Sequence, residues 1–188
     1  RHNNHVHVSF LQSGPPTATV LGLPGTATSD ASTAGGGQAA PDGVQPYQPT
    51  GTQKSQSLTP EQQANIKALI AAARRSGITP TGRAAVLAVA YAGAQTNFIS
   101  KMPTNNDPRI GIFGEVPLEG TADTSNLINV PYAANAFFDR LKQVAATDQQ
   151  WATEPLSDVL VKMFPDQATN GPGFGTWEQL SIGAVTQL

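Results

Sequence analysis

The sequence predicts a mainly α-helical protein, in which one small helical domain over residues 58–188 follows a long extended, irregular segment. From Leu58 onward, apolar residues recur with the three-to-four-residue spacing of helices. Residues 11–57, in contrast, contain 8 Gly, 6 Pro and 12 Ser or Thr among 47 residues. A segment of that composition buries too little apolar surface to offset the entropy lost on ordering. We therefore divide the chain into residues 1–10, 11–57 and 58–188.

Composition restricts the possible partners. The 188 residues include 11 basic and 13 acidic side chains, so the formal net charge is −2 and no nucleic-acid partner is expected from charge. No apolar run approaches the roughly 20 residues of a membrane segment. Cysteine is absent, which excludes disulfides and thiolate metal sites. The chain begins at Arg1 inside a patterned segment, so we expect a fragment of a longer protein.

The first 57 residues contain two different kinds of sequence. Residues 5–10 alternate in polarity, which predicts a β-strand. Residues 11–57 fit either a passive linker or an extended segment that becomes ordered against a partner, with Val20, Leu21 and Leu23 as possible contacts. Both alternatives remain open at this point.

The first helix has a clear start and a clear end. Thr59 suits the N-cap, Pro60 the first helical position, and Gln62 the third position, where its side chain can close a capping box. Gly77 is placed to end the helix.

Three more helices are expected further along. Residues 82–98 are rich in alanine and apolar on every side, which predicts the buried centre of the domain. Residues 99–130 are predicted to be a loop, with residues 110–113 crossing the core as a strand or turn. A third helix is expected from about Pro131 and a fourth over about residues 156–164. For residues 171–188, helix and loop remain equally open.

Four short motifs occur in order within this region. They are Ala94-Gln95-Thr96 at the end of the second helix, Gly111-Ile112-Phe113, Pro131-Tyr132-Ala133-Ala134 followed by Phe137-Phe138, and Phe164-Pro165-Asp166. Over residues 59–166 the chain thereby resembles an actinobacterial lysozyme-like family of peptidoglycan hydrolases. That family has a helix ending in Gln-Glu-Ser, a Gly-Leu-Phe-Gln turn, a Pro-Tyr-Ala-Ala helix with paired aromatic residues, and a closing Phe-Pro-Asp.

The chain differs from the family at the catalytic acid and at the glutamine of the turn. The resemblance places the catalytic glutamate at Gln95, followed by Thr96, and the glutamine of the turn at Gly114. Cleaving a glycosidic bond requires a carboxylic acid that protonates the leaving oxygen, and loss of a general acid lowers the rate by about 10²–10⁴. We therefore expect a degenerate, non-catalytic site. Glu115 is a possible substitute acid.

The resemblance also implies which residues lie on the substrate side of the site. These residues are Phe113, Gly114 and Tyr132.

A second candidate site lies in residues 1–10. In a strand, His5 and His7 project from one face and could approach one metal ion. The stretch resembles the last strand of zinc peptidoglycan peptidases of the D-alanyl-D-alanine carboxypeptidase and hedgehog-like class, in which His7 would ligate zinc and His5 would lie beside the scissile bond. A zinc site needs three protein ligands, and His2 is the only other histidine. We thus expect no cofactor, and zinc only if a peptidase domain precedes this chain; an ordinary strand or tail is the alternative.

Taken together, a peptidase-like strand, a linker and a lysozyme-like module resemble the C-terminal part of tape-measure or tail-tip proteins of phages that infect actinobacteria. This arrangement predicts a virion component in a large assembly, with residues 11–57 contacting other tail proteins. The domain would then act in tail assembly, tip plugging or contact with peptidoglycan during genome delivery. The alternatives are an active peptidoglycan hydrolase and a secreted glycan-binding pseudoenzyme at an actinobacterial cell wall.

Overall fold

The computed structural model describes residues 49, 51–117, 125–167 and 173–188. The strand predicted for residues 1–10, with His5 and His7, and residues 11–48 and 50 of the predicted linker lie outside the described residues. The described helices are α1 (Pro60–Ser76), α2 (Thr81–Thr96), α3 (Ser125–Ile128), α4 (Val130–Thr147), α5 (Leu156–Met163) and α6 (Glu178–Gln187), with 3₁₀ turns η2 (Pro165–Gln167) and η3 (Phe174–Trp177). The prediction of a mainly helical domain is confirmed.

Helix α1 begins and ends at the predicted residues. Thr59 Oγ1 accepts a hydrogen bond from the Gln62 backbone N–H (3.3 Å), and the Thr59 N–H donates to Gln62 Oε1 (2.8 Å). Gly77 closes the helix with φ of 74°, a left-handed conformation that glycine adopts without a steric penalty. The capping box therefore forms as its sequence predicts.

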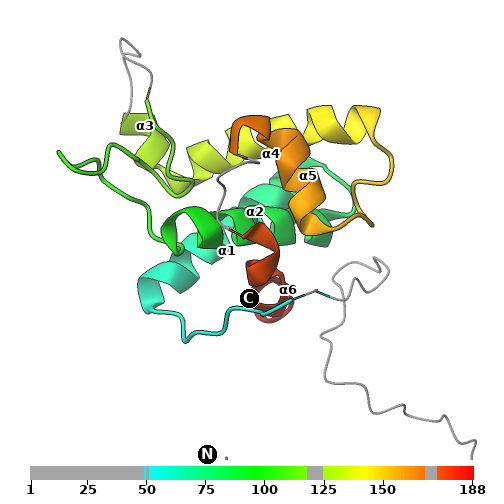
Figure 1. The fold of residues 1–188 in the computed structure, drawn as a ribbon, viewed down its shortest axis with the longest axis horizontal. Helices are drawn as coiled ribbons and strands as arrows, with labels where there is room; N and C mark the ends of the chain where they lie inside the picture. Colours follow the sequence, from blue (N-terminus) through cyan, green and yellow to red (C-terminus); the bar gives the residue numbers. More distant parts are fainter. Residues whose placement is uncertain (1–48, 50, 118–124, 168–172) are drawn as a thin grey trace, which may run out of the picture. The chain divides into compact units, whose positions relative to one another are not determined.

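Helix α2 is the buried centre of the domain. It packs against α1, α4, α5 and α6, and Figure 1 shows it in green between α4 and α6. Five of its six alanines are buried and Ala94 is partly buried; their methyl side chains let the neighbouring helices approach closely. In the described part of the chain, no helix has both the length and the hydrophobicity needed to cross a membrane.

Aromatic rings join α2 to the surrounding elements. The Tyr91 ring stacks on Phe164 with a centroid distance of 4.3 Å, and lies 5.4 Å from Phe113 and 5.7 Å from Phe137. Such pairs contribute roughly 0.5–1.5 kcal/mol each beyond their buried area. The cluster therefore fixes the 110–113 turn and the end of α5 onto the middle of α2.

The remaining predicted boundaries differ from the observed ones by a few residues. The predicted second, third and fourth helices correspond to α2, α4 and α5. Helix α2 covers Thr81–Thr96, α4 starts at Val130 and α5 ends at Met163. Residues 110–113 form a turn with isolated bridges, Lys101 to Gly111 and Ile110 to Glu115. The undecided C-terminal region folds as η3 and α6.

A buried ion pair links the start of α2 to the start of α6. Arg83 Nη1 donates to Glu178 Oε1, with both side chains at most 4% exposed, and Arg83 Nη2 donates to the Glu154 carbonyl (2.7 Å). Burial raises the pKa of Glu178, and the Arg83 guanidinium opposes that rise. Removing one partner of such a pair costs roughly 3–5 kcal/mol because the other charge stays buried.

Candidate functional site

The chain makes an unusual turn at the C-terminal end of α2. Asn97 and Phe98 both have positive φ, 54° and 63°. Two side chains from α1 hold this turn: Gln62 Nε2 donates to the Asn97 carbonyl and Asn65 Nδ2 donates to the Phe98 carbonyl, each at 2.8 Å. These bonds offset the strain of two consecutive left-handed residues.

The turn places the Phe98 ring against the Trp177 ring. The two rings meet edge to face, with centroids 5.2 Å apart and an interplanar angle of 89°. Both rings press against α2 at Gly93, where a Cβ atom would lie 2.7 Å from Phe98 and 2.8 Å from Trp177. Any side chain at position 93 would therefore displace these rings.

An open hollow lies at this end of α2. Its lining contains amides, two ammonium groups, one indole ring and small side chains: Lys54, Gln56, Gly93, Ala94, Gln95, Thr96, Asn97, Lys101 and Trp177. None of these described lining residues is a carboxylate. The described part of the hollow thus offers hydrogen-bond donors and positive charge, but no carboxylic acid.

The structure brings together three residues of the predicted site. Gln95 lines the hollow, and a Cβ atom on Gly114 would lie 3.7 Å from Gln95 Cβ and 3.4 Å from Thr96 Cγ2. The buried Thr96 hydroxyl donates to the Ile112 carbonyl (2.6 Å), and its oxygen also lies 3.1 Å from the Ala92 carbonyl. Thr96 therefore holds the 110–114 turn against α2.

The two predicted aromatic contacts lie elsewhere. Phe113 is only 3% exposed and belongs to the aromatic core, with its ring centroid 5.1 Å from that of Phe137. Tyr132 is 51% exposed on the first turn of α4, which contributes no residue to the lining of the hollow. Neither ring lines the hollow beside Gln95.

The nearby carboxylates are held outside the hollow. Glu115 is half-buried and its backbone pairs with Ile110; burial raises its pKa, and the positive charge of Arg140 opposes the rise. Asp107 accepts hydrogen bonds from Arg109 Nε (2.8 Å) and Lys101 Nζ (3.0 Å), and these contacts lower its pKa well below the usual range. Asp107 is consequently a fixed anion rather than a proton donor at neutral pH.

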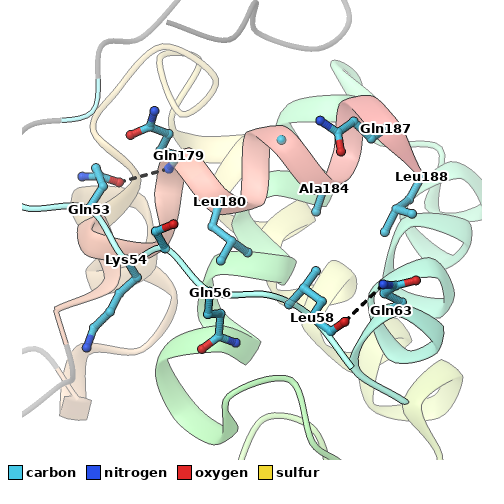
Figure 2. A pocket seen from close by; sticks show the side chains of 12 residues that line it. Gln53, Lys54, Gln56, Leu58, Gln63, Gln179, Leu180, Ala184, Gln187 and Leu188 are labelled. Atoms are coloured by element: carbon cyan, nitrogen blue, oxygen red, sulfur yellow. Dashed lines mark hydrogen bonds between the residues drawn. The ribbon is translucent and has the colours of Figure 1, made fainter. Parts of the chain in front are cut away.

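Residues 53–58 lie on the helical domain, although residues 53–57 were predicted as the end of the linker and only Leu58 as part of the domain. We call this segment the strap. A groove runs between the strap and α6, as Figure 2 shows, with Leu58, Leu180, Ala184 and Leu188 among its apolar lining residues. Among the described residues that line the groove, Lys54 alone has a charged side chain, and it also lines the hollow beside Gln95.

The sequence did not predict that the strap packs on the domain, because the contacts of the strap connect distant parts of the sequence. Lys54 is an isolated charge in a polar stretch, and nothing local distinguishes it from a solvated lysine. Trp177 is 8% exposed, so most of its surface is used in packing.

The described residues contain no cluster of three or more His, Asp or Glu side chains that could hold a metal ion. His5 and His7 lie outside them.

No family model, curated protein or solved structure matches this chain. The geometry of the hollow is therefore what bears on function.

Proposed function

We propose that residues 58–188 are a non-catalytic, lysozyme-like module that contacts cell-wall glycan as part of a phage tail tape-measure or tail-tip protein. The main support is that Gln95 stands at the sequence position where the resemblance expects the catalytic acid, and that it lines a hollow whose described lining includes no carboxylate. An amide has no titratable proton to give to a leaving sugar oxygen. Its N–H and C=O groups can still hydrogen-bond sugar hydroxyl and acetamido groups.

The place of this module in a tail is proposed from the order of the segments, a peptidase-like strand, a linker and a lysozyme-like domain. In such an assembly, residues 11–57 contact other tail proteins, and the domain meets peptidoglycan as the tail tip penetrates the wall. A secreted glycan-binding pseudoenzyme would use the same hollow without an assembly. Cross-linking of residues 11–57 to other tail proteins in purified virions distinguishes these two locations.

One observation favours an active hydrolase as a second candidate. Glu115 is next to Gly114, which lies against Gln95, and burial raises the Glu115 pKa as it does for many general acids. Against this candidate, Glu115 does not line the hollow, and Arg140 stabilises its ionised form. We therefore favour the non-catalytic function.

A turbidity assay on purified peptidoglycan tests the proposal with the wild-type chain, Gln95→Glu and Glu115→Gln. We expect no clearing by the wild type, while the wild type still co-sediments with the insoluble wall. Clearing by Gln95→Glu alone would show that the site lacks only its acid. Clearing by the wild type refutes the proposal, and loss of that clearing in Glu115→Gln would identify Glu115 as the acid.

A further inference from the structure

The strap is fixed to the turn that precedes α6. The Lys54 backbone N–H donates to the Thr176 carbonyl (2.7 Å), and Gln53 Nε2 donates to the Gly175 carbonyl (3.0 Å). In return, the Gln179 N–H donates to Gln53 Oε1 (3.0 Å), the bond drawn in Figure 2. Three hydrogen bonds within two strap residues give Lys54 a defined backbone position.

Because the strap is anchored in this way, the side chains of Lys54 and Gln56 lie at the hollow. Lys54 Nζ lies 6.0 Å from the centroid of the Trp177 ring, within the range of a cation–π contact. Gln56 Nε2 donates to Asn97 Oδ1 (2.9 Å) at the end of α2. Lys54 and Gln56 are consequently part of the lining that also contains Gln95.

Lys101 brings a second positive charge to the same hollow. Its backbone is held by two hydrogen bonds to Gly111 (3.1 and 2.8 Å), and its Nζ lies 3.0 Å from Asp107 Oδ2. Asp107 is shared with Arg109, so its single negative charge does not neutralise both cations. The hollow therefore has an excess of positive charge, although the whole chain is slightly acidic.

We infer that Lys54 and Lys101 form a carboxylate-binding subsite in this hollow, and that its ligand is a glycan with acidic groups. This inference rests on the proposed glycan contact and specifies the class of glycan. The two ammonium groups attract a carboxylate, and the lining also contains the side-chain amides of Gln56, Gln95 and Asn97, a group type that hydrogen-bonds hydroxyl and acylamino groups of sugars. The strap is then part of the binding site rather than a passive spacer.

Binding of soluble glycans to the full chain tests this inference by calorimetry. The probes are a neutral N-acetylglucosamine oligomer, a peptidoglycan glycan fragment that keeps its sugar carboxylates but has no peptides, and the same fragment with peptides. The last two arms separate sugar carboxylates from peptide carboxylates. The variants are Lys54→Gln, Lys101→Gln and the charge-preserving Lys54→Arg. The control is Lys142→Gln, an exposed lysine on α4 paired with Asp139.

We expect the wild type to bind an acidic fragment more tightly than the neutral oligomer. Lys54→Gln and Lys101→Gln should each weaken acidic binding about two- to fivefold, as expected for solvent-exposed charge pairs, and leave neutral binding unchanged. Lys54→Arg and Lys142→Gln should retain wild-type binding, and added salt should reduce the preference for acidic probes. Circular dichroism of each variant shows whether it is folded.

Equal affinity of the wild type for neutral and acidic probes, binding to none of the probes, or an equal loss in Lys142→Gln would overturn the subsite. None of these results depends on hydrolysis. Clearing of peptidoglycan by the wild type would refute the non-catalytic proposal while leaving a charge-dependent preference intact, so the two failures are distinguishable.

Discussion

Gly93 gives a direct test of how the hollow is built. A Cβ atom at this position would lie 2.7 and 2.9 Å from two atoms of the Phe98 ring and 2.8 Å from an atom of the Trp177 ring. Ordinary contacts begin near 3.4 Å, so both rings would have to move away from α2 in Gly93→Ala. Phe98 is fully buried and Trp177 is 8% exposed, which leaves them little room.

The expected change in the free energy of unfolding of Gly93→Ala results from two opposing effects. Alanine inside a helix is favoured over glycine by about 1 kcal/mol. Overpacking a core typically costs about 1–3 kcal/mol, and the upper end applies because two separate rings are displaced. We therefore expect Gly93→Ala to lower the free energy of unfolding by about 2 kcal/mol, a decrease of several degrees in the melting temperature.

Urea unfolding followed by tryptophan fluorescence and circular dichroism measures this difference. The matched control is Gly175→Ala, because a Cβ atom there meets nothing within 4 Å; its stability should stay within about 0.5 kcal/mol of the wild type. A Gly93→Ala protein as stable as the wild type, or more stable, would show that helix propensity outweighs the ring contacts and would refute the packing argument.

Two further predictions concern the turn beside Gln95. Gly111→Ala places a Cβ atom 2.2 Å from the Leu127 carbonyl oxygen at a positive φ, so we expect the free energy of unfolding in urea to fall by about 3 kcal/mol. Gly77→Ala has a similar φ but open space around the Cβ atom, so it should lose only about 1 kcal/mol. Equal losses in the two variants would contradict the steric explanation. Burial raises the folded-state pKa of Glu115 above its ordinary value of 4.5, so its contribution to stability is present below pH 4.5 and is lost as the pH rises through the folded-state pKa. Glu115→Gln should therefore improve in stability relative to the wild type between pH 4 and pH 7, and a constant difference between the two proteins would contradict this sign.

Sequence patterns predicted the elements that depend on neighbouring residues. Thr59, Pro60 and Gln62 determine the start of α1 through contacts within one turn, so no tertiary information was needed. The alanine-rich composition of α2 likewise predicted its burial.

Contacts between distant segments were not predictable from local patterns. The strap is held by residues 175–179, more than 120 positions away, and its composition alone favoured a linker. Helix α6 was equally ambiguous, because its apolar residues are few and its place in the core depends on Trp177 and on the buried Arg83–Glu178 pair. At the site, the pattern identified Gln95, Thr96 and Gly114, but it did not reveal the lysines that give the hollow its charge.

The Arg83–Glu178 pair also has a consequence for synthesis on the ribosome. The two residues are 95 positions apart, so α2 emerges from the exit tunnel long before its buried guanidinium can meet a counter-charge. Until residues near 178 appear, burying Arg83 is unfavourable because its guanidinium lacks the Glu178 counter-charge. The contacts of residues 53–54 with residues 175–179 likewise form only after all of the intervening chain has been translated.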